Sequence, residues 1–267
     1  MKERIQKVLA NAGVASRRNI EEMIRQGRVS VNGKIVTELP VLIDPEEDKV
    51  RVDDELIKLS TSPRAGRVYF LLHKPRGVYS TNVAQGEQKR AIDLLPPGLP
   101  RVYPVGRLDA DSTGLLLLTN DGELTNQLTH PRYGVAKTYR AVVDGLVTAE
   151  ELEKLQKGIW LADPVKNVGF KTGRSFIRVI KRTRQKTILE ITIREGRNRQ
   201  VRRMLAKVGH KVRDLMRIRM GPLSLDNLRP GQFRPLTSKE IRALKELAQQ
   251  AEQSTSTKPP GRKRSGA

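Results

Sequence analysis

A turn between two glycines that runs directly into four leucines places the strongest constraint on how this chain folds. Residues 106–114 read GRLDADSTG and residues 115–118 read LLLL. Four adjacent apolar residues without polar alternation predict a buried element. The turn is therefore a loop with charged side chains that is anchored in the core, which is how reactive groups are commonly mounted on a rigid scaffold. The residue types alone also allow a structural turn in which Asp109 or Asp111 caps backbone N–H groups.

The charge balance indicates a polyanionic partner. The 267 residues include 51 Lys plus Arg against 29 Asp plus Glu, a formal charge of +22. A membrane surface is disfavoured as the partner, because no long helical segment pairs a basic face with a continuous apolar face. No apolar run approaches the roughly 20 residues that cross a bilayer. We therefore predict nucleic acid as the partner, and the absence of an apolar signal core at the N-terminus predicts a cytoplasmic protein.

The inventory of metal-binding and nucleophilic residues excludes several kinds of chemistry. The chain has no cysteine, which rules out disulfides, thiolate metal sites and RNA methylation through a cysteine nucleophile. Its three histidines, His73, His130 and His210, lie far apart and lack the spacing of metal ligands. We therefore expect no metal site.

Residues 1–60 are predicted to form a small separate module. Apolar residues at helical spacing follow Ile5, and Ser16 is placed to cap a second helix. Two short alternating segments then flank Asn32-Gly33, which is a strong signal for a two-residue hairpin. Two helices and a hairpin with many arginines predict a compact basic unit.

The remaining chain is predicted to be a second, larger domain of the α+β class. A turn-rich linker at 61–67 precedes a domain over 68–236 that mixes strands and helices without a regular βαβ repeat, so we expect a mixed, mainly antiparallel sheet flanked by helices. A capping box at Thr237-Ser238-Lys239-Glu240 predicts a C-terminal helix over 237–253. The basic segment 254–267 is rich in Ser, Lys, Pro and Gly and is predicted to be disordered.

Four ordered motifs of the larger domain resemble the RsuA/RluB-type ribosomal-RNA pseudouridine synthases. They are GRLDADSTGLLLLTNDGEL at 106–124, LHKPRGV at 72–78, KTYR at 137–140 and EGRNRQVRRM at 195–204. The resemblance implies an enzyme that isomerises a uridine of ribosomal RNA to pseudouridine. The full-length pattern is more similar to the RluB-type branch, which implies large-subunit (23S) rRNA.

The N-terminal module resembles the S4 RNA-binding domain. The resemblance is carried by RIQKVL at 4–9, ASRR at 15–18 and GRVSVNG at 27–33. It implies that the helical face with Arg17 and Arg18 holds structured RNA. Phosphate contacts of this kind position a protein without reading sequence.

Three catalytic residues are implied by the resemblance. Asp109 is the essential carboxylate, which either attacks the anomeric carbon or takes a proton from the ribose, and Asp111 is its neighbouring alternative. Tyr139 stacks on the flipped uracil. Arg202 pairs with the catalytic carboxylate and holds it ionised, with Arg203 as the alternative in register. A strand tyrosine is otherwise commonly a core residue.

Further residues are implied to contact the RNA. Arg107 helps to open the substrate, either by filling the vacated stack or by holding a phosphate. Leu215 packs against the base unless it is a plain core leucine. The motifs also contain basic residues that are expected either to grip backbone phosphates or to form a solvated face: Lys74, Arg76, Arg197 and Arg199. Isomerisation moves no electrons to or from another molecule and transfers no group from outside, so we expect no cofactor.

Three other functions remain consistent with parts of the sequence. The same enzyme could act on small-subunit (16S) rRNA, because both branches carry the S4 module. The basic module alone would suit a non-catalytic rRNA assembly factor, although such a factor does not need Asp109, Tyr139 and Arg202. A glycosidase built on Asp109 and Asp111 would release free uracil. We expect the protein to act as a monomer on rRNA or on a precursor particle.

Overall fold

The computed structural model describes residues 2–59, 66–163 and 168–256. Internal contacts divide the chain into two compact units, 1–67 and 68–267. Residues 61–65 of the predicted linker and 257–267 of the predicted tail lie outside the described residues. The first three residues of that predicted tail belong to the last helix, which ends at Ser256.

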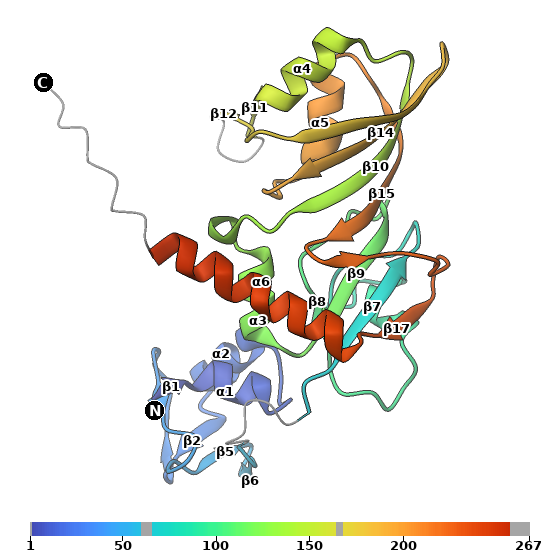
Figure 1. Cartoon of the computed structure of the whole chain (residues 1–267). Helices are drawn as coiled ribbons and strands as arrows, with labels where there is room; N and C mark the ends of the chain where they lie inside the picture. The colour runs from blue at the N-terminus through green and yellow to red at the C-terminus, as the bar shows by residue number, and fades with distance from the viewer. Residues whose placement is uncertain (1, 60–65, 164–167, 257–267) are drawn as a thin grey trace, which may run out of the picture. The chain divides into compact units, whose positions relative to one another are not determined.

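The N-terminal unit packs two helices against small antiparallel sheets (Figure 1). Ser16 caps the second helix, because its side chain accepts a hydrogen bond from the Asn19 backbone N–H. Asn32 and Gly33 both have positive φ, 51° and 81°, as the predicted two-residue hairpin requires. The elements are α1 (Ile5–Asn11), α2 (Arg17–Arg25), β1 (Glu3–Arg4) with β4 (Leu42–Ile43), and β2 (Val29–Val31), β3 (Lys34–Ile35), β5 (Val50–Val52) and β6 (Glu55–Leu56).

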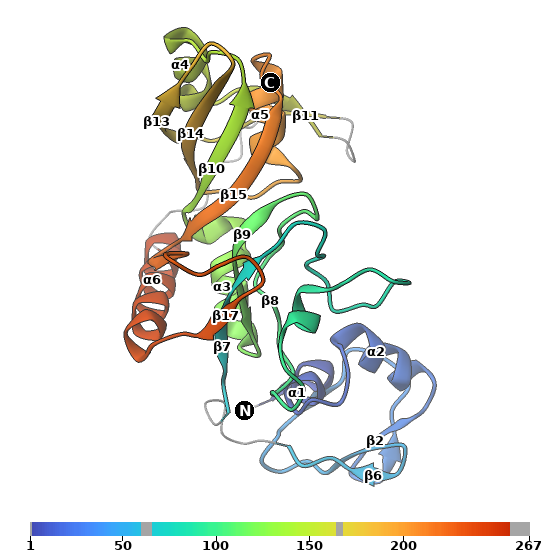
Figure 2. The ribbon, with the colours of Figure 1, turned by 90° about the vertical axis from the view of Figure 1, so that its right-hand side faces the viewer.

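One large sheet organises the second unit (Figure 2). From one edge to the other it contains β13 (Phe176–Arg182), β14 (Lys186–Ile193), β10 (Lys137–Asp144), β15 (Val212–Met220), β9 (Thr113–Thr119), β7 (Tyr69–Lys74) and β17 (Phe233–Pro235). Two short strands extend it, β16 (Leu223–Ser224) on β15 and β8 (Tyr103–Pro104) on β9. Within the described residues every pairing in this sheet is antiparallel except β15 with β9. The predicted α+β fold with a mixed, mainly antiparallel sheet is confirmed.

The four leucines of β9 explain why the sheet needs covers on both faces. Leu115, Leu116, Leu117 and Leu118 are all fully buried. Leu116 and Leu118 join one core, whereas Leu115 and Leu117 join another. Because successive side chains of a strand point to opposite faces, the tetrad anchors two cores at once.

Helices supply much of the remaining cover. The first core includes side chains of α4 (Ala149–Lys157) and α5 (Gln200–Lys207). The second includes side chains of α3 (Gly122–Thr129) and α6 (Ser238–Ser256). The capping box at the start of α6 forms as predicted, since Thr237 and Glu240 exchange backbone-to-side-chain hydrogen bonds. The other elements are the 3₁₀ turns η1 (Ala91–Leu94) and η2 (Pro131–Tyr133) and the hairpin of β11 (Trp160–Ala162) with β12 (Gly169–Lys171).

Gly114 allows the two parallel strands to meet directly behind the charged turn. It pairs with Arg217, and its φ is +106°. A Cβ at this position would lie 2.7 Å from the Arg217 backbone nitrogen and closer still to its carbonyl oxygen. Only glycine therefore permits this approach, which ties the turn before β9 to the middle of β15.

Candidate active site

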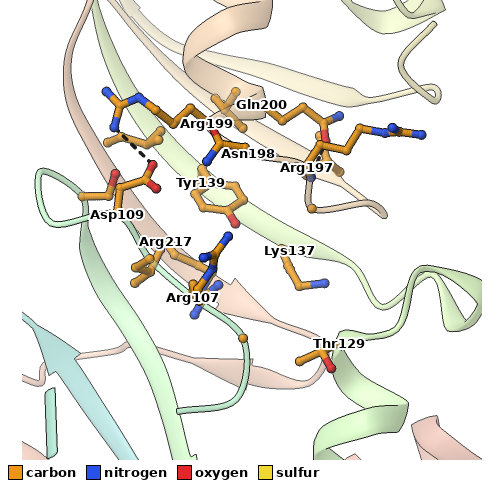
Figure 3. Close-up of a pocket in the computed structure, with 17 residues that line it drawn as sticks. Arg107, Asp109, Thr129, Lys137, Tyr139, Arg197, Asn198, Arg199, Gln200 and Arg217 are labelled. Carbon is orange, nitrogen blue, oxygen red and sulfur yellow. Dashed lines mark hydrogen bonds and ion pairs between the residues drawn. The ribbon is translucent and has the colours of Figure 1, made fainter. Parts of the chain in front are cut away.

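A pocket of about 220 Å³ lies where the predicted catalytic turn faces β10 and β15 (Figure 3). The turn contributes Arg107 and Asp109, and the segment before α5 contributes Arg197 and Arg199. The remaining wall includes side chains from the two central strands and from α3, namely Lys137, Tyr139, Leu215, Arg217 and Thr129. Three of the four sequence motifs thus converge on one cavity.

Backbone hydrogen bonds fix the turn that carries Asp109. The Ser112 N–H donates to the Asp109 carbonyl oxygen at 3.0 Å, which closes the turn itself. The Ser80 hydroxyl oxygen accepts from the Leu108 N–H at 3.1 Å and donates to the Leu108 carbonyl oxygen at 3.0 Å. The Gly77 N–H donates to the Ala110 carbonyl oxygen at 2.8 Å. The motif at 72–78 therefore supports the turn from behind and does not line the pocket.

Arg199 binds both carboxylates of the turn. Its guanidinium lies 3.4 Å from Asp109 Oδ2 and donates to both oxygens of Asp111, at 3.1 and 2.9 Å. This bond to Arg199 is the main cause of a lowered pKa of the Asp111 carboxyl. Arg199 has φ +47°, an uncommon value for a residue other than glycine, and strain of this kind is concentrated at functional sites. The contacts of its side chain are consistent with such a role.

The predicted pairing of Arg202 with Asp109 needs correction. Arg202 donates to the Asp111 carbonyl oxygen at 3.1 Å and lies 3.4 Å from the Asp111 carboxylate. Arg202 lies near the start of α5, and from there its side chain reaches the backbone of the loop at Asp111. Arg199 precedes the helix, and its side chain reaches Asp109. Burial lowers the pKa of Arg202. Arg203, the alternative in register, bonds to the Ala162 carbonyl oxygen and is not a pocket residue.

Tyr139 and Leu215 line the pocket from adjacent strands. Tyr139 is 9% exposed and Leu215 is 6% exposed, and both belong to the core on that face of the sheet. In Figure 3 the phenol oxygen of Tyr139 points away from Asp109, toward Arg107 and Arg217. A role in contacting the base and a role in core packing are therefore compatible for both residues, because each is a core residue with one edge in the cavity.

Two of the predicted phosphate ligands have partners within the protein. Lys74 is fully buried, and its Nζ donates to the carbonyl oxygens of Pro75 and Val78 at 2.9 and 2.8 Å. Burial lowers its pKa to about 8. Lys74 is thus a support of the loop that follows β7, and the prediction that it binds phosphate is wrong. Arg199 is exposed and paired with Asp109 and Asp111, and its role as a phosphate ligand stays a prediction.

The other predicted RNA ligands, apart from Leu215, are all exposed. Arg107 is exposed at the pocket, and Arg197 stacks over the Phe170 ring at 4.0 Å from its centroid. Arg76 is exposed and forms an ion pair with Asp214 at 2.5 Å. Arg17 and Arg18 are exposed on α2 of the N-terminal unit.

Lys137 and Arg217 were not selected from the sequence as site residues. Lys137 lies two positions before Tyr139 on β10, so strand alternation places both on the same face. That spacing could have identified it. Arg217 pairs with Tyr139 across the sheet, and only the β10–β15 register reveals this neighbour.

The arrangement is suited to an anionic substrate that places a planar ring in the cavity. A carboxylate, fixed by an arginine, lies at one side of the cavity, and an aromatic side chain and several cations complete it. In the described part of the chain, no cluster of three or more His, Asp or Glu side chains could hold a metal ion. None of the helices within those ranges is long and apolar enough to span a membrane.

Two family models match the chain. The RNA pseudouridylate synthase model matches residues 68–207, and the S4 domain model matches residues 3–48. These ranges contain the four motifs and the basic helices from which the resemblance was identified.

Full-length relatives agree with the family models. The ribosomal large subunit pseudouridine synthase B of Bacillus subtilis (strain 168) is 45% identical over 248 residues, which are 92% of this chain and 97% of the relative. An uncharacterized RNA pseudouridine synthase of Aquifex aeolicus (strain VF5) is 44% identical over 91% of this chain and 94% of its own. A crystal structure of pseudouridylate synthase matches with a TM-score of 0.63 and 32% identity, over 90% of this chain and 99% of that one. The chain therefore belongs to the RNA pseudouridine synthase family and combines that catalytic domain with an S4 domain.

Proposed function

We propose that this enzyme isomerises a uridine of large-subunit ribosomal RNA and that Asp109 is its catalytic carboxylate. The substrate follows from the relative named for the large subunit, which is similar along nearly the whole chain. The single observation that best supports the catalytic role is the position of Asp109 in a cationic pocket beside Tyr139, on a turn held by hydrogen bonds from the Ser80 hydroxyl and the Gly77 N–H.

The reaction needs a carboxylate near the sugar and a firm hold on the base. Asp109 either attacks the anomeric carbon as the C1′–N1 bond breaks or takes a proton from the adjacent ribose carbon. Tyr139 and Leu215 border the space for the detached uracil, which must rotate before C5 bonds to C1′. Substrate and product have the same atoms, so the route needs no external oxidant or donor.

RNA binding is divided between general and local contacts in this proposal. Arg17 and Arg18 hold structured RNA through phosphates, while Arg107 occupies the space that the flipped uridine leaves in the stack. Arg197 is stacked on Phe170 and exposed at the pocket, and it holds a neighbouring phosphate. Binding should weaken steeply with salt, because phosphate neutralisation releases counterions. All the proposed catalytic residues belong to one chain, and we propose that a monomer is the active form.

The substrate is tested by mapping pseudouridine in transcripts of both rRNAs after incubation with the purified enzyme. Carbodiimide-induced stops of reverse transcription should appear at one uridine of the large-subunit transcript and at none of the small-subunit transcript. Stops only in the small-subunit transcript would show that the enzyme modifies small-subunit rRNA instead. Tight binding without conversion of either transcript, or of the corresponding precursor particles, would instead indicate an assembly factor. Free uracil in the reaction would indicate a glycosidase.

A further inference from the structure

Two cations of the pocket have no carboxylate partner among the described residues. Lys137 from β10 and Arg217 from β15 lie on the side of Tyr139 away from the Asp109–Arg199 pair (Figure 3). The carboxylates of the turn are bound by Arg199 and Arg202 instead. The carboxylates of the turn therefore account for the positive charge of Arg199 and Arg202, but not for that of Lys137 and Arg217.

Arg217 is buried with an unused donor. It is 2% exposed, and its Nε donates to the Leu115 carbonyl oxygen at 2.7 Å. Its Nη2 is buried and has no hydrogen-bond acceptor within the described ranges of the chain. A buried charged donor without a partner is costly, and Arg217 also lines the cavity, so an acceptor on a bound ligand would satisfy its guanidinium.

Lys137 is the second donor on this side. Its Nζ bonds to the Val135 carbonyl oxygen at 3.2 Å, which leaves further N–H groups for a ligand. Burial, and then the charge of Arg217, lower its pKa to about 8. The other charged groups that line the cavity are Arg107, Arg197, Arg199 and Asp109, so arginines outnumber carboxylates around it.

We propose that Lys137 and Arg217 bind the carbonyl oxygens of the flipped uracil and stabilise the negative charge that the base carries after the glycosidic bond breaks. This inference rests on the proposed function. When C1′–N1 breaks heterolytically, the electron pair goes to N1, and resonance spreads the charge to the carbonyl oxygens. C5 then bonds to C1′ and loses its proton, while N1 gains one. The Asp109 carboxylate is released from C1′ in the same step on the nucleophilic route, or returns its proton to the ribose on the other route, so the atoms balance. Cations fixed where this charge develops lower the barrier.

The same pair also discriminates between bases. Uracil presents carbonyl oxygens at both O2 and O4, whereas cytosine has an amino group at C4. Lysine and arginine only donate hydrogen bonds, so the amino group of cytosine would place one donor against another, and neither would have an acceptor. The cationic side of the pocket is therefore a determinant of uridine over cytidine.

Substitution of Lys137 tests the proposal in the full-length enzyme. Lys137→Met should lower the single-turnover rate of conversion by about tenfold or more, while the Kd for the RNA changes by less than about threefold. Lys137→Arg should retain more activity than Lys137→Met, because it keeps the charge. Lys154→Met is the matched control, since Lys154 is exposed on α4 and pairs with Glu150. An unchanged single-turnover rate in Lys137→Met, or a loss confined to RNA affinity, would overturn the proposal.

A pH profile gives a reading that does not depend on the methionine variant. Lys137 carries its charge below its pKa of about 8 and loses it as the pH rises through that value. The wild-type kcat/KM should therefore fall above about pH 8, and Lys137→Arg should move this fall to higher pH. An alkaline limb that is the same in both enzymes would contradict the proposal. If the wild type converted no uridine, the proposed function itself would be wrong. If the wild type is active but Lys137→Met is equally active, only the inference about Lys137 and Arg217 is wrong.

Discussion

Replacing Gly114 by alanine should damage the enzyme more than its distance from the pocket suggests. An alanine Cβ would lie 2.7 Å from the Arg217 backbone nitrogen and still closer to its carbonyl oxygen, so β9 and β15 must separate. Overpacking of this kind costs roughly 1–3 kcal/mol, and left-handed backbone costs a further ~1–2 kcal/mol for a residue with a Cβ. We expect Gly114→Ala to lower the free energy of unfolding by about 2–5 kcal/mol.

The control for this substitution is Gly209→Ala. Gly209 has φ +90°, but a Cβ there would meet nothing within 4 Å, so only the backbone cost of about 1–2 kcal/mol applies. Urea unfolding followed by circular dichroism measures both variants. Single-turnover assays on folded protein should also show a larger loss for Gly114→Ala, because the strand shift moves Asp109 relative to Tyr139. Equal losses of stability in the two variants would refute the close approach of β9 and β15.

Three further perturbations have defined outcomes. Asp111→Asn should change stability by less than about 1 kcal/mol, because the side chains of its ion pair with Arg199 are nearly half exposed. It should still slow single-turnover conversion about tenfold, since Arg199 loses its second anchor; equal rates for variant and wild type would contradict this. Lys74→Met should lower the free energy of unfolding by about 2 kcal/mol in urea, because two loop carbonyls lose their donor; a more stable variant would show that the buried charge dominates. The bond from Arg234 lowers the pKa of Glu240 to about 2, so its stabilisation is complete above about pH 4.5 and is lost as pH falls toward 2. Glu240→Gln should therefore cost about 1–3 kcal/mol at pH 7, and a difference that persists at pH 2 would disprove the linkage.

Local patterns predicted the elements that depend on neighbouring residues. Ser16 and Thr237 begin helices as expected, and Asn32-Gly33 makes its hairpin. The leucine tetrad was correctly predicted to be buried. Each of these signals is contained within a few residues of sequence, so no distant partner is needed to read it.

Features that depend on distant partners were missed or misassigned. The segment of β15 carries four charged residues in nine, yet it is a central strand because β10 and β9 pair with it. Lys74 is the last residue of the buried strand β7 and was predicted to contact phosphate or solvent, but the loop after it folds back and buries the amine. Arg199, rather than Arg202, reaches Asp109 because the turn before α5 projects it there. Tertiary geometry decides all three.

The central claim is that Asp109 performs the chemistry on a uridine of rRNA. It is tested most directly by mapping pseudouridine in large-subunit rRNA after incubation with Asp109→Asn under single-turnover conditions, with Asp111→Asn as the matched control from the same turn. We predict no conversion by Asp109→Asn, RNA affinity close to that of the wild type, and slowed but complete conversion by Asp111→Asn. Full conversion by Asp109→Asn would contradict the account.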